Sequence, residues 1–363
     1  MTPRILSLAQ GNVPSPIYLP DATFAVVRSV DAQDLEAIGI DALVMNTFHL
    51  MLKPGSSTVQ SLGGLHKMSG WKKSIVTDSG GFQAYSLIRQ NPKFGTLHEK
   101  GITFQPEGSS RKYQLTPEKT VQLQMGFGSD VVICLDDCTH VDEGYAEQKI
   151  SVDRTIKWAK ACKKEFTRLV GEKKLSESSR PRLYAVVQGG GYKDLRLCCA
   201  EALLAIGFDG YGFGGWPLDK ENHLLSEIIA YTREIIPTEF PMHALGIGHP
   251  ENVLACYDFG YDIFDSAMPT RDARHGRLYT FTTPASSPLT GDWLKYLYIN
   301  DEEHIHNGGP ISEYCDCPCC QHYSVGYLHH LFKMGDTLFM RLATLHNLRF
   351  MVQLCDRIRA GAQ

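Results

Sequence analysis

Three aspartates in this sequence each close a short apolar run, where a buried strand would end. Asp78 ends the run SIVTD, Asp136 ends DVVICLD, and Asp265 follows the apolar pair of DIFDSAM. A single aspartate in such a place is an ordinary helix cap or turn former. Three together are less easily explained, because the carboxyl ends of barrel strands meet at one rim. Other runs would bring an amide and bare glycine backbone to the same rim: Gln188, Gly214, Gly215, Gly246 and Gly248.

Carboxylates at such a rim are suited to chemistry at the anomeric carbon of a sugar. One carboxylate can attack that carbon and form a glycosyl ester, while a second carries the proton of the leaving group. A third, unpaired aspartate can accept two hydrogen bonds from the amidine-like edge of a purine, and a glutamine can donate to a carbonyl. Glycine lets backbone groups approach a planar ring. This set of groups suits the exchange of a base on a nucleoside.

Eight runs rich in valine, isoleucine and aromatic residues would position these groups. They lie at residues 23–27, 41–47, 74–78, 130–136, 183–189, 210–215, 243–248 and 262–268. Helices are predicted between most of them, from apolar residues at three- and four-residue spacing, at 151–166, 194–207, 221–236 and 250–260. This rhythm predicts an α/β fold, a (β/α)8 TIM barrel over residues 1–284. A doubly wound open sheet is the alternative, because periodicity alone does not separate a closed sheet from an open one.

Two further parts are expected beside the barrel strands and helices. The third strand–helix unit is longer than the others, and its insert GITFQPEGSSRKYQLTP (101–117) is predicted to be a hairpin turning at Glu107 to Ser109. After residue 284 the sequence changes character and passes through a cysteine cluster into helical stretches. We therefore predict a zinc-binding helical subdomain over residues 285–363, packed on the barrel.

The cysteine cluster has the spacing of a metal site. Cys315, Cys317 and Cys320 form C-x-C-x-x-C, and zinc prefers such thiolates with one imidazole in a tetrahedral arrangement. A closed four-ligand site leaves no position for water, so the predicted Zn²⁺ is structural. Spacing alone leaves open a set that uses Cys319, or free thiols without metal. It also leaves four candidates for the fourth ligand: His322, His329, His330 and His346.

Composition limits the classes of function. Of 363 residues, 36 are Lys or Arg and 40 are Asp or Glu, so the net charge of -4 gives no global sign of binding to nucleic acid or anionic membranes. Such binding must be local, and Arg271, Arg274 and Arg277 in TRDARHGR are the candidates beside Asp265. Eleven cysteines without framework spacing, no signal peptide and no apolar run of about 20 residues predict a cytoplasmic protein with no membrane contact.

Several motifs together carry a resemblance that covers almost the full length. The chain resembles a tRNA-guanine transglycosylase of the bacterial type in residues 26–55 and in TDSGGFQ, LDDCT, VVQGGG, FDSAMPTRDARHGR, CxCxxC and TLHNLRF. The resemblance implies that Asp265 is the nucleophile that attacks C1′ of the ribose and that Asp78 is the general acid and base. It selects His346 as the fourth zinc ligand.

The resemblance also implies two sets of binding residues. Asp136 would recognise the edge of the base, Gln188 and Gly215 its carbonyl, Phe82 would stack on it, and Cys138 would lie beside the pocket. The full set implied for the base is Ser79, Gly80, Gly81, Phe82, Asp136, Cys138, Gln188, Gly214, Gly215 and Gly246. The set implied for RNA is Gly248, His249, Arg271 and Arg274.

For function, the resemblance implies exchange of guanine at position 34 of GUN-anticodon tRNAs for a 7-deazaguanine, preQ1 or queuine. The reaction would be retaining, through a covalent RNA-protein intermediate, in a homodimer formed through the zinc region. The chain has no room for the additional C-terminal RNA-binding domains of the archaeal class, which favours the anticodon.

One departure leaves the incoming base open. The family usually reads GGLAVGE after the sixth strand, whereas this chain reads GGWPLDK (214–220), with Lys220 where a glutamate is expected. Asp137 also stands where glutamate is common. Because this loop contacts the 7-substituent in the family, the sequence does not choose between preQ1 and queuine.

Two other classes of function remain as alternatives. A barrel nucleoside hydrolase would share the paired carboxylates but would need neither a zinc subdomain nor arginines beside the nucleophile. A non-catalytic partner subunit would keep the fold and the zinc while losing the chemistry. The presence of Asp78, Asp136 and Asp265 together argues against the second alternative.

Overall fold

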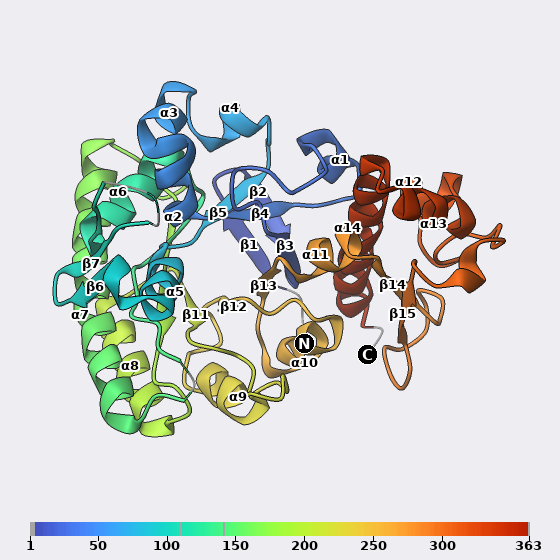
Figure 1. Ribbon diagram of the computed structural model, residues 1–363. Coiled ribbons are helices and arrows are strands. Elements are labelled where there is room, and N and C mark those ends of the chain that lie inside the picture. Colours follow the sequence, from blue (N-terminus) through green and yellow to red (C-terminus); the bar gives the residue numbers. More distant parts are fainter. Residues whose placement is uncertain (1–3, 107, 109–110, 141, 362–363) are drawn as a thin grey trace.

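An eight-stranded parallel sheet, nearly closed into a barrel, forms the centre of the computed structural model (Figure 1). The structure describes residues 4–361 apart from 107, 109–110 and 141. The barrel strands in chain order are β3 (Ile17–Pro20), β4 (Ala42–Met45), β5 (Ser74–Thr77), β9 (Val131–Ile133), β10 (Arg182–Val187), β11 (Gly210–Phe213), β12 (Met242–Ala244) and β13 (Ile263–Ser266). Their order in the sheet is β3-β13-β12-β11-β10-β9-β5-β4.

The two ends of this sheet meet. Asp21, directly after β3, forms a parallel bridge with Val44 of β4, and the Ala22 backbone N–H donates to the Val44 carbonyl at 2.7 Å. A doubly wound open sheet has no such contact between its edge strands. The sequence prediction of a barrel is therefore confirmed, and the open-sheet alternative is wrong.

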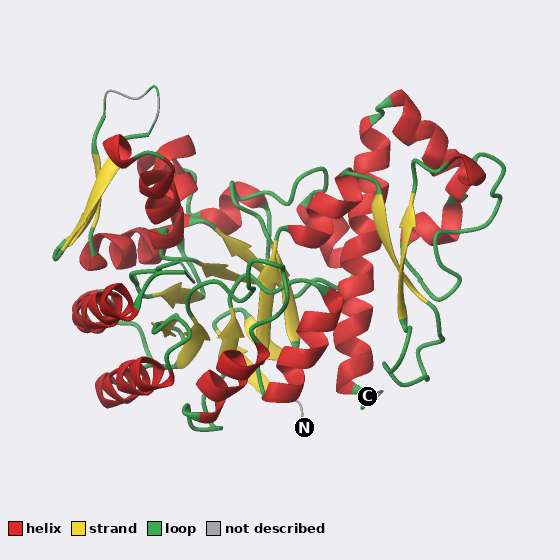
Figure 2. Cartoon of the chain, turned by 60° about the horizontal axis from the view of Figure 1, so that its bottom comes forward, coloured by secondary structure: helices red, strands yellow, loops and turns green. Residues whose placement is uncertain are grey.

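Helices surround the barrel and cover its outer face (Figures 1 and 2). Both faces of the sheet are thus buried, and strands such as β4 and β5 consist of buried residues throughout. Within the described residues, no helix is both long and apolar enough to cross a membrane. The helices up to the last barrel unit are α1 (Ala32–Ala37), α2 (Thr47–Leu50), α3 (Ser56–Ser61), α4 (Leu65–Ser69), α5 (Gly81–Gln90), α6 (Pro117–Phe127), α7 (Tyr145–Glu172), α8 (Lys193–Ile206), α9 (Ser226–Glu234), α10 (Pro250–Phe259) and α11 (Met268–Arg274), with short helical turns η1 (Met51–Gly55) and η2 (Pro92–Phe94).

The first barrel strand is not where the sequence predicted it. Residues 23–27 form turns, with Ala25 at a φ of 61° and Val26 about half exposed, and the strand is Ile17–Pro20 instead. Prolines at both ends of this short run reduce its strand signal, because proline donates no hydrogen bond to a neighbouring strand. The prediction for residues 23–27 is wrong, and the correction moves the first strand end to Asp21.

The predicted helices are observed with different ends. α7 begins before and ends after the predicted 151–166, whereas α9 begins five residues later than predicted. The late start has a structural cause. Residues 214–225 form a loop closed by a bridge between Leu218 and Leu224, and the Asp219 carboxylate accepts from the backbone N–H groups of Glu221 and His223.

The insert forms a small antiparallel sheet on the side of the barrel. β6 (Gly95–His98) pairs with β7 (Gly101–Phe104), which pairs with β8 (Tyr113–Leu115). The predicted hairpin is confirmed by the β7–β8 pairing. Its predicted turn at Glu107 to Ser109 lies outside the described residues, apart from Gly108.

The C-terminal part packs against the barrel through one long helix (Figure 2). It contains a hairpin of β14 (Arg277–Phe281) and β15 (Leu294–Tyr298), the turn η3 (Glu302–His304), and helices α12 (Pro318–His322), α13 (Val325–Met334) and α14 (Thr337–Arg359). The Asn347 amide on α14 donates to the carbonyls of Pro269 and Arg277 and accepts from the Tyr279 N–H. The predicted boundary at 284/285 falls between the two paired strands.

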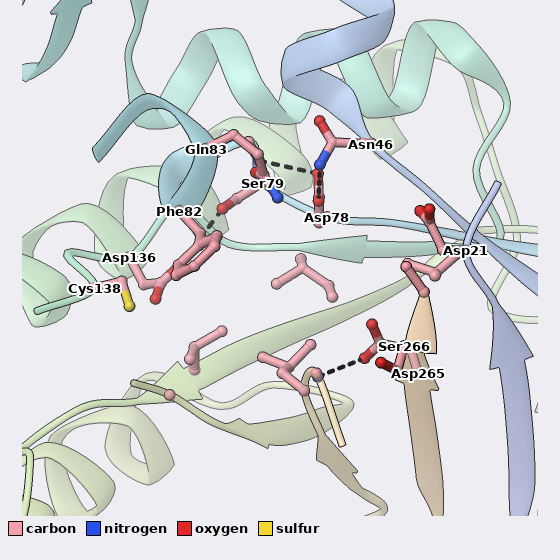
Figure 3. A pocket seen from close by; sticks show the side chains of 18 of the residues that line it. Asp21, Asn46, Asp78, Ser79, Phe82, Gln83, Asp136, Cys138, Asp265 and Ser266 are labelled. Carbon is pink, nitrogen blue, oxygen red and sulfur yellow. Dashed lines mark hydrogen bonds between the residues drawn. The ribbon is translucent and has the colours of Figure 1, made fainter. Parts of the chain in front are cut away.

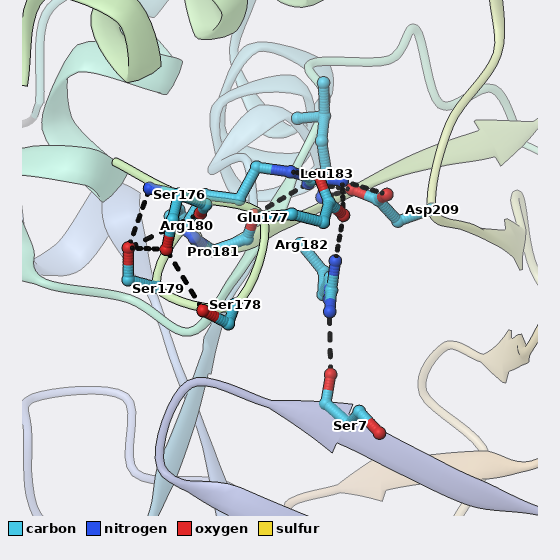
Figure 4. Close-up of polar contacts among 10 residues, drawn as sticks. All are labelled: Ser7, Ser176, Glu177, Ser178, Ser179, Arg180, Pro181, Arg182, Leu183 and Asp209. Atoms are coloured by element: carbon cyan, nitrogen blue, oxygen red, sulfur yellow. Dashed lines mark hydrogen bonds and ion pairs between the residues drawn. The ribbon is translucent and has the colours of Figure 1, made fainter. Parts of the chain in front are cut away.

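A polar network closes the opposite end of the barrel (Figure 4). Arg180 pairs with Glu177 and Asp209, and the same Asp209 carboxylate accepts from the Leu183 N–H at 2.8 Å. The outer hairpin of β1 (Ile5–Leu8) and β2 (Gly11–Pro14) is joined to this end, because Arg182 donates to the Ser7 carbonyl. These contacts fix the starts of β10 and β11, far along the strands from the candidate site.

Candidate active site

A cavity of about 450 Å³ opens at the carboxyl ends of the barrel strands (Figure 3). In the picture, Asp136 and Cys138 lie across the cavity from Asp21 and Asp265. Residues at or near the ends of all eight barrel strands line it: Asp21, Asn46, Asp78, Asp136, Val186, Gly214, Gly246 and Asp265. The barrel thus brings the three predicted carboxylates to one cavity.

Asp78 is partly buried and held by three donors. Its Oδ1 accepts from the backbone N–H groups of Thr47 (2.9 Å) and Gly80 (3.1 Å), and its Oδ2 accepts from the Asn46 amide (2.6 Å). Burial raises the pKa of Asp78 to about 7, against the lowering effect of the backbone hydrogen bonds, and the charges of Asp265 and Asp21 raise it further. At neutral pH this carboxyl can therefore both give and take a proton.

Asp136 is paired with a glutamine on the neighbouring strand. The Gln188 amide donates to Asp136 Oδ2 at 2.7 Å, and Ser79 donates to Oδ1 at 3.4 Å. Burial raises the pKa of Asp136 to about 6, although the hydrogen bond from Gln188 opposes this. Gln188 lies behind Asp136, does not line the cavity, and has a buried Oε1 without a partner among the described residues. It holds Asp136 in place and has an acceptor to spare.

Only one of the two carboxylate oxygens of Asp265 is hydrogen-bonded to other described residues. Its Oδ1 lies 2.8 Å from His243 Nε2 and accepts from the Gly246 N–H at 3.0 Å. Neither contact involves Oδ2. The side chain is partly exposed to the cavity, whereas the imidazole is buried. Oδ2 is therefore the oxygen available to a ligand.

Two glycines are required by this packing. Gly80 has a φ of 78°, and a Cβ there would lie 2.9 Å from the Phe48 backbone N. A Cβ on Gly214 would lie 2.5 Å from the Gln188 side-chain nitrogen that donates to Asp136. A side chain at either position would displace the groups that position Asp78 or Asp136. Gly81 does not line the cavity and donates its N–H to Ser79 Oγ.

Aromatic side chains form the outer wall of the cavity. Phe82 and Trp216 are about two-fifths exposed and meet edge to face with ring centroids 5.6 Å apart, and His140 lies 5.7 Å from Trp216. Such a wall suits a flat heterocycle. Cys138 also lines the cavity, but burial raises the pKa of its thiol well above the usual value, with the Asp136 charge adding to the effect. It is a neutral packing group rather than a nucleophile.

The loop that departs from the family pattern forms the apolar part of this wall. Trp216, Pro217 and Leu218 line the cavity. Lys220 does not; its Nζ lies 3.4 Å from the Asp142 carboxylate, and its side chain is largely exposed. The substitution that was most conspicuous in the sequence therefore lies outside the cavity.

Four ligand-type atoms converge in the C-terminal part. The sulfur atoms of Cys315, Cys317 and Cys320 and a nitrogen of His346 all lie within 4.8 Å of one another. His346 Nδ1 is 3.6 Å from Cys317 Sγ and 3.3 Å from Cys320 Sγ, and tetrahedral bonds of about 2.0–2.3 Å give ligand separations of roughly this size. Its Nε2 donates to the Tyr279 carbonyl at 2.7 Å, which orients the ring. The cluster could hold a metal ion.

The remaining candidate ligands lie elsewhere. His322 and His330 are exposed, and His329 is buried with Nδ1 2.7 Å from the Ile299 carbonyl. Cys319 is buried in the apolar core of this part and does not belong to the cluster. Of the alternatives that spacing left open, the structure favours the Cys315, Cys317, Cys320 and His346 set.

Comparison with known proteins gives the family. A sequence model described as Queuine tRNA-ribosyltransferase matches residues 4–362. The chain belongs to this family. Relatives named queuine tRNA-ribosyltransferase include one from Caldanaerobacter subterraneus, 36% identical over 98% of this chain and 88% of its own length. Another from Thermotoga maritima is 37% identical over 99% of this chain and 90% of its own length, and one from Psychrobacter is 35% identical over 98% and 88%.

Three arginines follow Asp265 in this member of the queuine tRNA-ribosyltransferase family. Arg271 is exposed, and Arg274 is half-buried with a buried Nη1 that has no partner among the described residues. The pKa of Arg274 is lowered by burial and then by the charge of Arg28, which is exposed nearby. Arg277 is different, because it pairs with Asp272 and lies over the Tyr296 ring.

The other residues predicted to contact RNA, and the basic residues of the C-terminal helices, are mostly engaged in contacts within the chain. A Cβ on Gly248 would lie 2.2 Å from Ser266 Cβ, so this glycine lets the loop after β12 pass close to β13. His249 occupies the N-cap position of α10, and its ring shares a hydrogen bond of 2.8 Å with the Tyr296 hydroxyl. Basic residues of the C-terminal helices are engaged within the chain: Lys333 with Glu302, Arg341 with Asp34, Arg349 with Asp316, Arg357 with carbonyls of residues 283–287, and Arg359 with Asp356.

The sequence analysis missed several polar residues that line the cavity, and three of them lie near the ends of the first two barrel strands. These three are Asp21, Asn46 and His49. Burial raises the pKa of Asp21 and lowers that of His49. Asn46 follows the run ALVM and had the same signal as Asp78, a polar residue directly after a buried run. Asp21 was missed because the first strand was placed too late in the chain.

Proposed function

We propose that this chain is a tRNA-guanine transglycosylase that exchanges guanine at position 34 of GUN-anticodon tRNAs for a 7-deazaguanine, preQ1 or queuine. The observation that carries the proposal is the convergence of Asp78, Asp136 and Asp265 on one cavity in a member of the queuine tRNA-ribosyltransferase family. The family supplies the class of reaction. The residues of the cavity supply the mechanism.

Asp265 acts as the nucleophile. Its Oδ2 forms a bond to C1′ of the ribose as the bond from C1′ to N9 of guanine breaks, and the electron pair leaves on the base, which takes a proton from Asp78. In the second step the incoming base returns a proton to Asp78 and bonds to C1′, and the Asp265 carboxylate leaves. Two displacements retain the configuration. A pKa of about 7 for Asp78 supports both proton transfers.

Asp136 reads the edge of the base and the aromatic wall covers its face. Asp136 is held by Gln188 and accepts from the base, while the Gly215 backbone addresses its carbonyl. Phe82 stands on the wall with Trp216, where a planar ring can stack. Ser79, Gly80, Gly214, Gly246 and Cys138 line the remainder of the pocket, and Gly81 supports it through its hydrogen bond to Ser79.

The anticodon loop lies over the cavity mouth and is bound by arginines. Arg271 and Arg274 follow the nucleophile on α11, and the unpartnered Nη1 of Arg274 supports a role in binding phosphate or a base edge. Gly248 and His249 border the same region. The net charge of -4 fits a local site of this kind better than a broad basic surface.

The metal is a structural Zn²⁺. Three thiolates and one imidazole are the donors zinc prefers, and a four-ligand site is closed to water. We further propose that residues 285–363 form the zinc-binding subdomain beside the catalytic barrel of residues 1–284, and that two copies associate through it. The protein would act in the cytoplasm, where its cysteines stay reduced.

The test is exchange of radiolabelled guanine into a GUN-anticodon tRNA, followed by a chase with unlabelled preQ1 or queuine. The chase that releases the label identifies the incoming base. In the Asp265→Asn variant we expect exchange to fall at least roughly a thousandfold and the denaturant-resistant RNA-protein adduct to disappear. Near-normal exchange by this variant would overturn the assignment. Hydrolysis of free nucleosides without RNA would favour a nucleoside hydrolase. A wild-type protein that is folded and zinc-loaded but inactive would favour a non-catalytic partner subunit.

A further inference from the structure

A buried histidine lies directly behind the proposed nucleophile. His243 is the middle residue of β12, pairs with Gly212 of β11 and Ile263 of β13, and is 1% exposed. Ile263 packs in the apolar interior of the barrel, and Asp265, two residues further along β13, faces the same side. The imidazole therefore lies in the barrel interior, one step below the carboxylate, and does not line the cavity.

The contacts of the imidazole indicate where its proton lies. Nε2 is 2.8 Å from Asp265 Oδ1, and Nδ1 is buried without a hydrogen-bond partner among the described residues. An ionised carboxylate offers no proton, so the proton of this hydrogen bond must be on Nε2. A second proton on Nδ1 would leave a buried donor unsatisfied, which is costly. The arrangement is that of a neutral imidazole that donates to Asp265.

We propose that His243 is a positioning residue that holds Asp265 Oδ1, directs Oδ2 toward C1′ and stabilises the carboxylate when it is released. The inference rests on the proposed function, because it assigns a role in the covalent step of that reaction. The N–H of Gly246, in the turn directly after β12, donates to the same oxygen. With Oδ1 bound twice, rotation of the carboxylate is restricted, and Oδ2 has no hydrogen bond to the described residues.

The hydrogen bond acts unequally on the two halves of the reaction. It is strongest when Asp265 carries a full negative charge and weaker when the carboxyl is a neutral glycosyl ester. Its removal therefore favours the ester over the free carboxylate. The adduct accumulates, and its breakdown by the incoming base slows. A residue that only supports the fold would not change this ratio in one direction.

The experiment measures the equilibrium ratio of the covalent adduct to the RNA complex whose glycosidic bond is intact. The guanine concentration is fixed, and the mixture is quenched in denaturant. His243→Leu keeps the volume and removes the donor, and His243→Gln keeps a donor at the place of Nε2. We expect the ratio to rise by about tenfold in the leucine variant, the size of a hydrogen bond to a charged group, with slower release of the adduct by preQ1 or queuine. The glutamine variant should remain within about twofold of the wild type.

A matched control is His329→Leu. This change removes another buried histidine, which lies on α13 and contacts the backbone carbonyl of Ile299. Its adduct ratio should equal that of the wild type. If the leucine variant at 243 does not fold, His243→Ala is measured with and without imidazole in the buffer, and imidazole should lower the ratio again. An unchanged ratio in the donor-less variant, or equal effects of leucine and glutamine, overturns the inference. Absence of adduct and exchange in the wild type would instead sink the proposed function.

Discussion

Burial is the main reason why the Asp78 carboxyl can both donate and accept a proton at neutral pH. Its pKa is raised to about 7 although three donors surround the carboxylate, because desolvation outweighs them and two further carboxylates stand nearby. Asp21 is one of these, and it lies at the junction that closes the barrel. Single residues of the cavity are therefore tuned by neighbours from distant parts of the chain.

The rate of adduct formation should depend on this proton. Asp78 must be protonated to supply the leaving guanine, so the single-turnover rate should be flat below pH 7 and fall about tenfold per pH unit above it. Rapid quenching and denaturing gels measure it. Asp21→Asn removes a charge that raises the pKa of Asp78, and should move the midpoint to lower pH. A rate without pH dependence between 6 and 9 would rule out this role.

At the scale of elements, the loop between β11 and α9 decides the shape of the outer cavity wall. The loop is held by the Asp219 turn and by the bridge from Leu218 to Leu224, and it presents Trp216 to Phe82. Lys220 lies on its far side, against Asp142. The residues of this loop that line the cavity are thus apolar or aromatic, and Lys220 is not among them.

Removal of the indole should weaken binding of the incoming base. In Trp216→Ala we expect KM for that base to rise by about tenfold with a smaller change in kcat, because stacking of a base on an aromatic ring contributes about 1–3 kcal/mol. Steady-state kinetics at saturating tRNA measure the effect. Tyr298→Ala is the control, since Tyr298 is a half-exposed aromatic residue on β15. Unchanged kcat/KM in the tryptophan variant would exclude the wall from base binding.

At the scale of the whole molecule, α14 connects the cluster of three cysteines and His346 to the segment that follows Asp265, the proposed nucleophile. His346 and Asn347 are neighbours on this helix. His346 belongs to the cluster and contacts the Tyr279 carbonyl, and Asn347 donates to the Pro269 carbonyl at the start of α11. Loss of the metal would therefore disturb α11, the helix that carries Arg271 and Arg274, more than it disturbs the cavity.

Metal removal should weaken binding of tRNA more than binding of the base. With chelator, or in His346→Ala, we expect affinity for an anticodon stem-loop to fall at least about tenfold and the C-terminal part to unfold, because the energy of metal binding contributes to folding. Fluorescence titration and proteolysis measure this. His322→Ala is the control, an exposed histidine near Cys320 but outside the cluster. A folded C-terminal part with normal tRNA affinity after loss of zinc would contradict the expectation.

The sequence by itself determined an α/β fold, three carboxylates at strand ends and a cysteine motif, and it left open the closure of the sheet and the exact set of ligands. These features are local, because each strand end or metal motif is written in a few adjacent residues. Tertiary structure alone decided the first strand, which is recognised only by its pairing with β13 and its bridge to β4, and with it the place of Asp21. It also decided that His243 meets Asp265. Such contacts join residues far apart in the chain, so no spacing pattern encodes them, and closure of the sheet creates them.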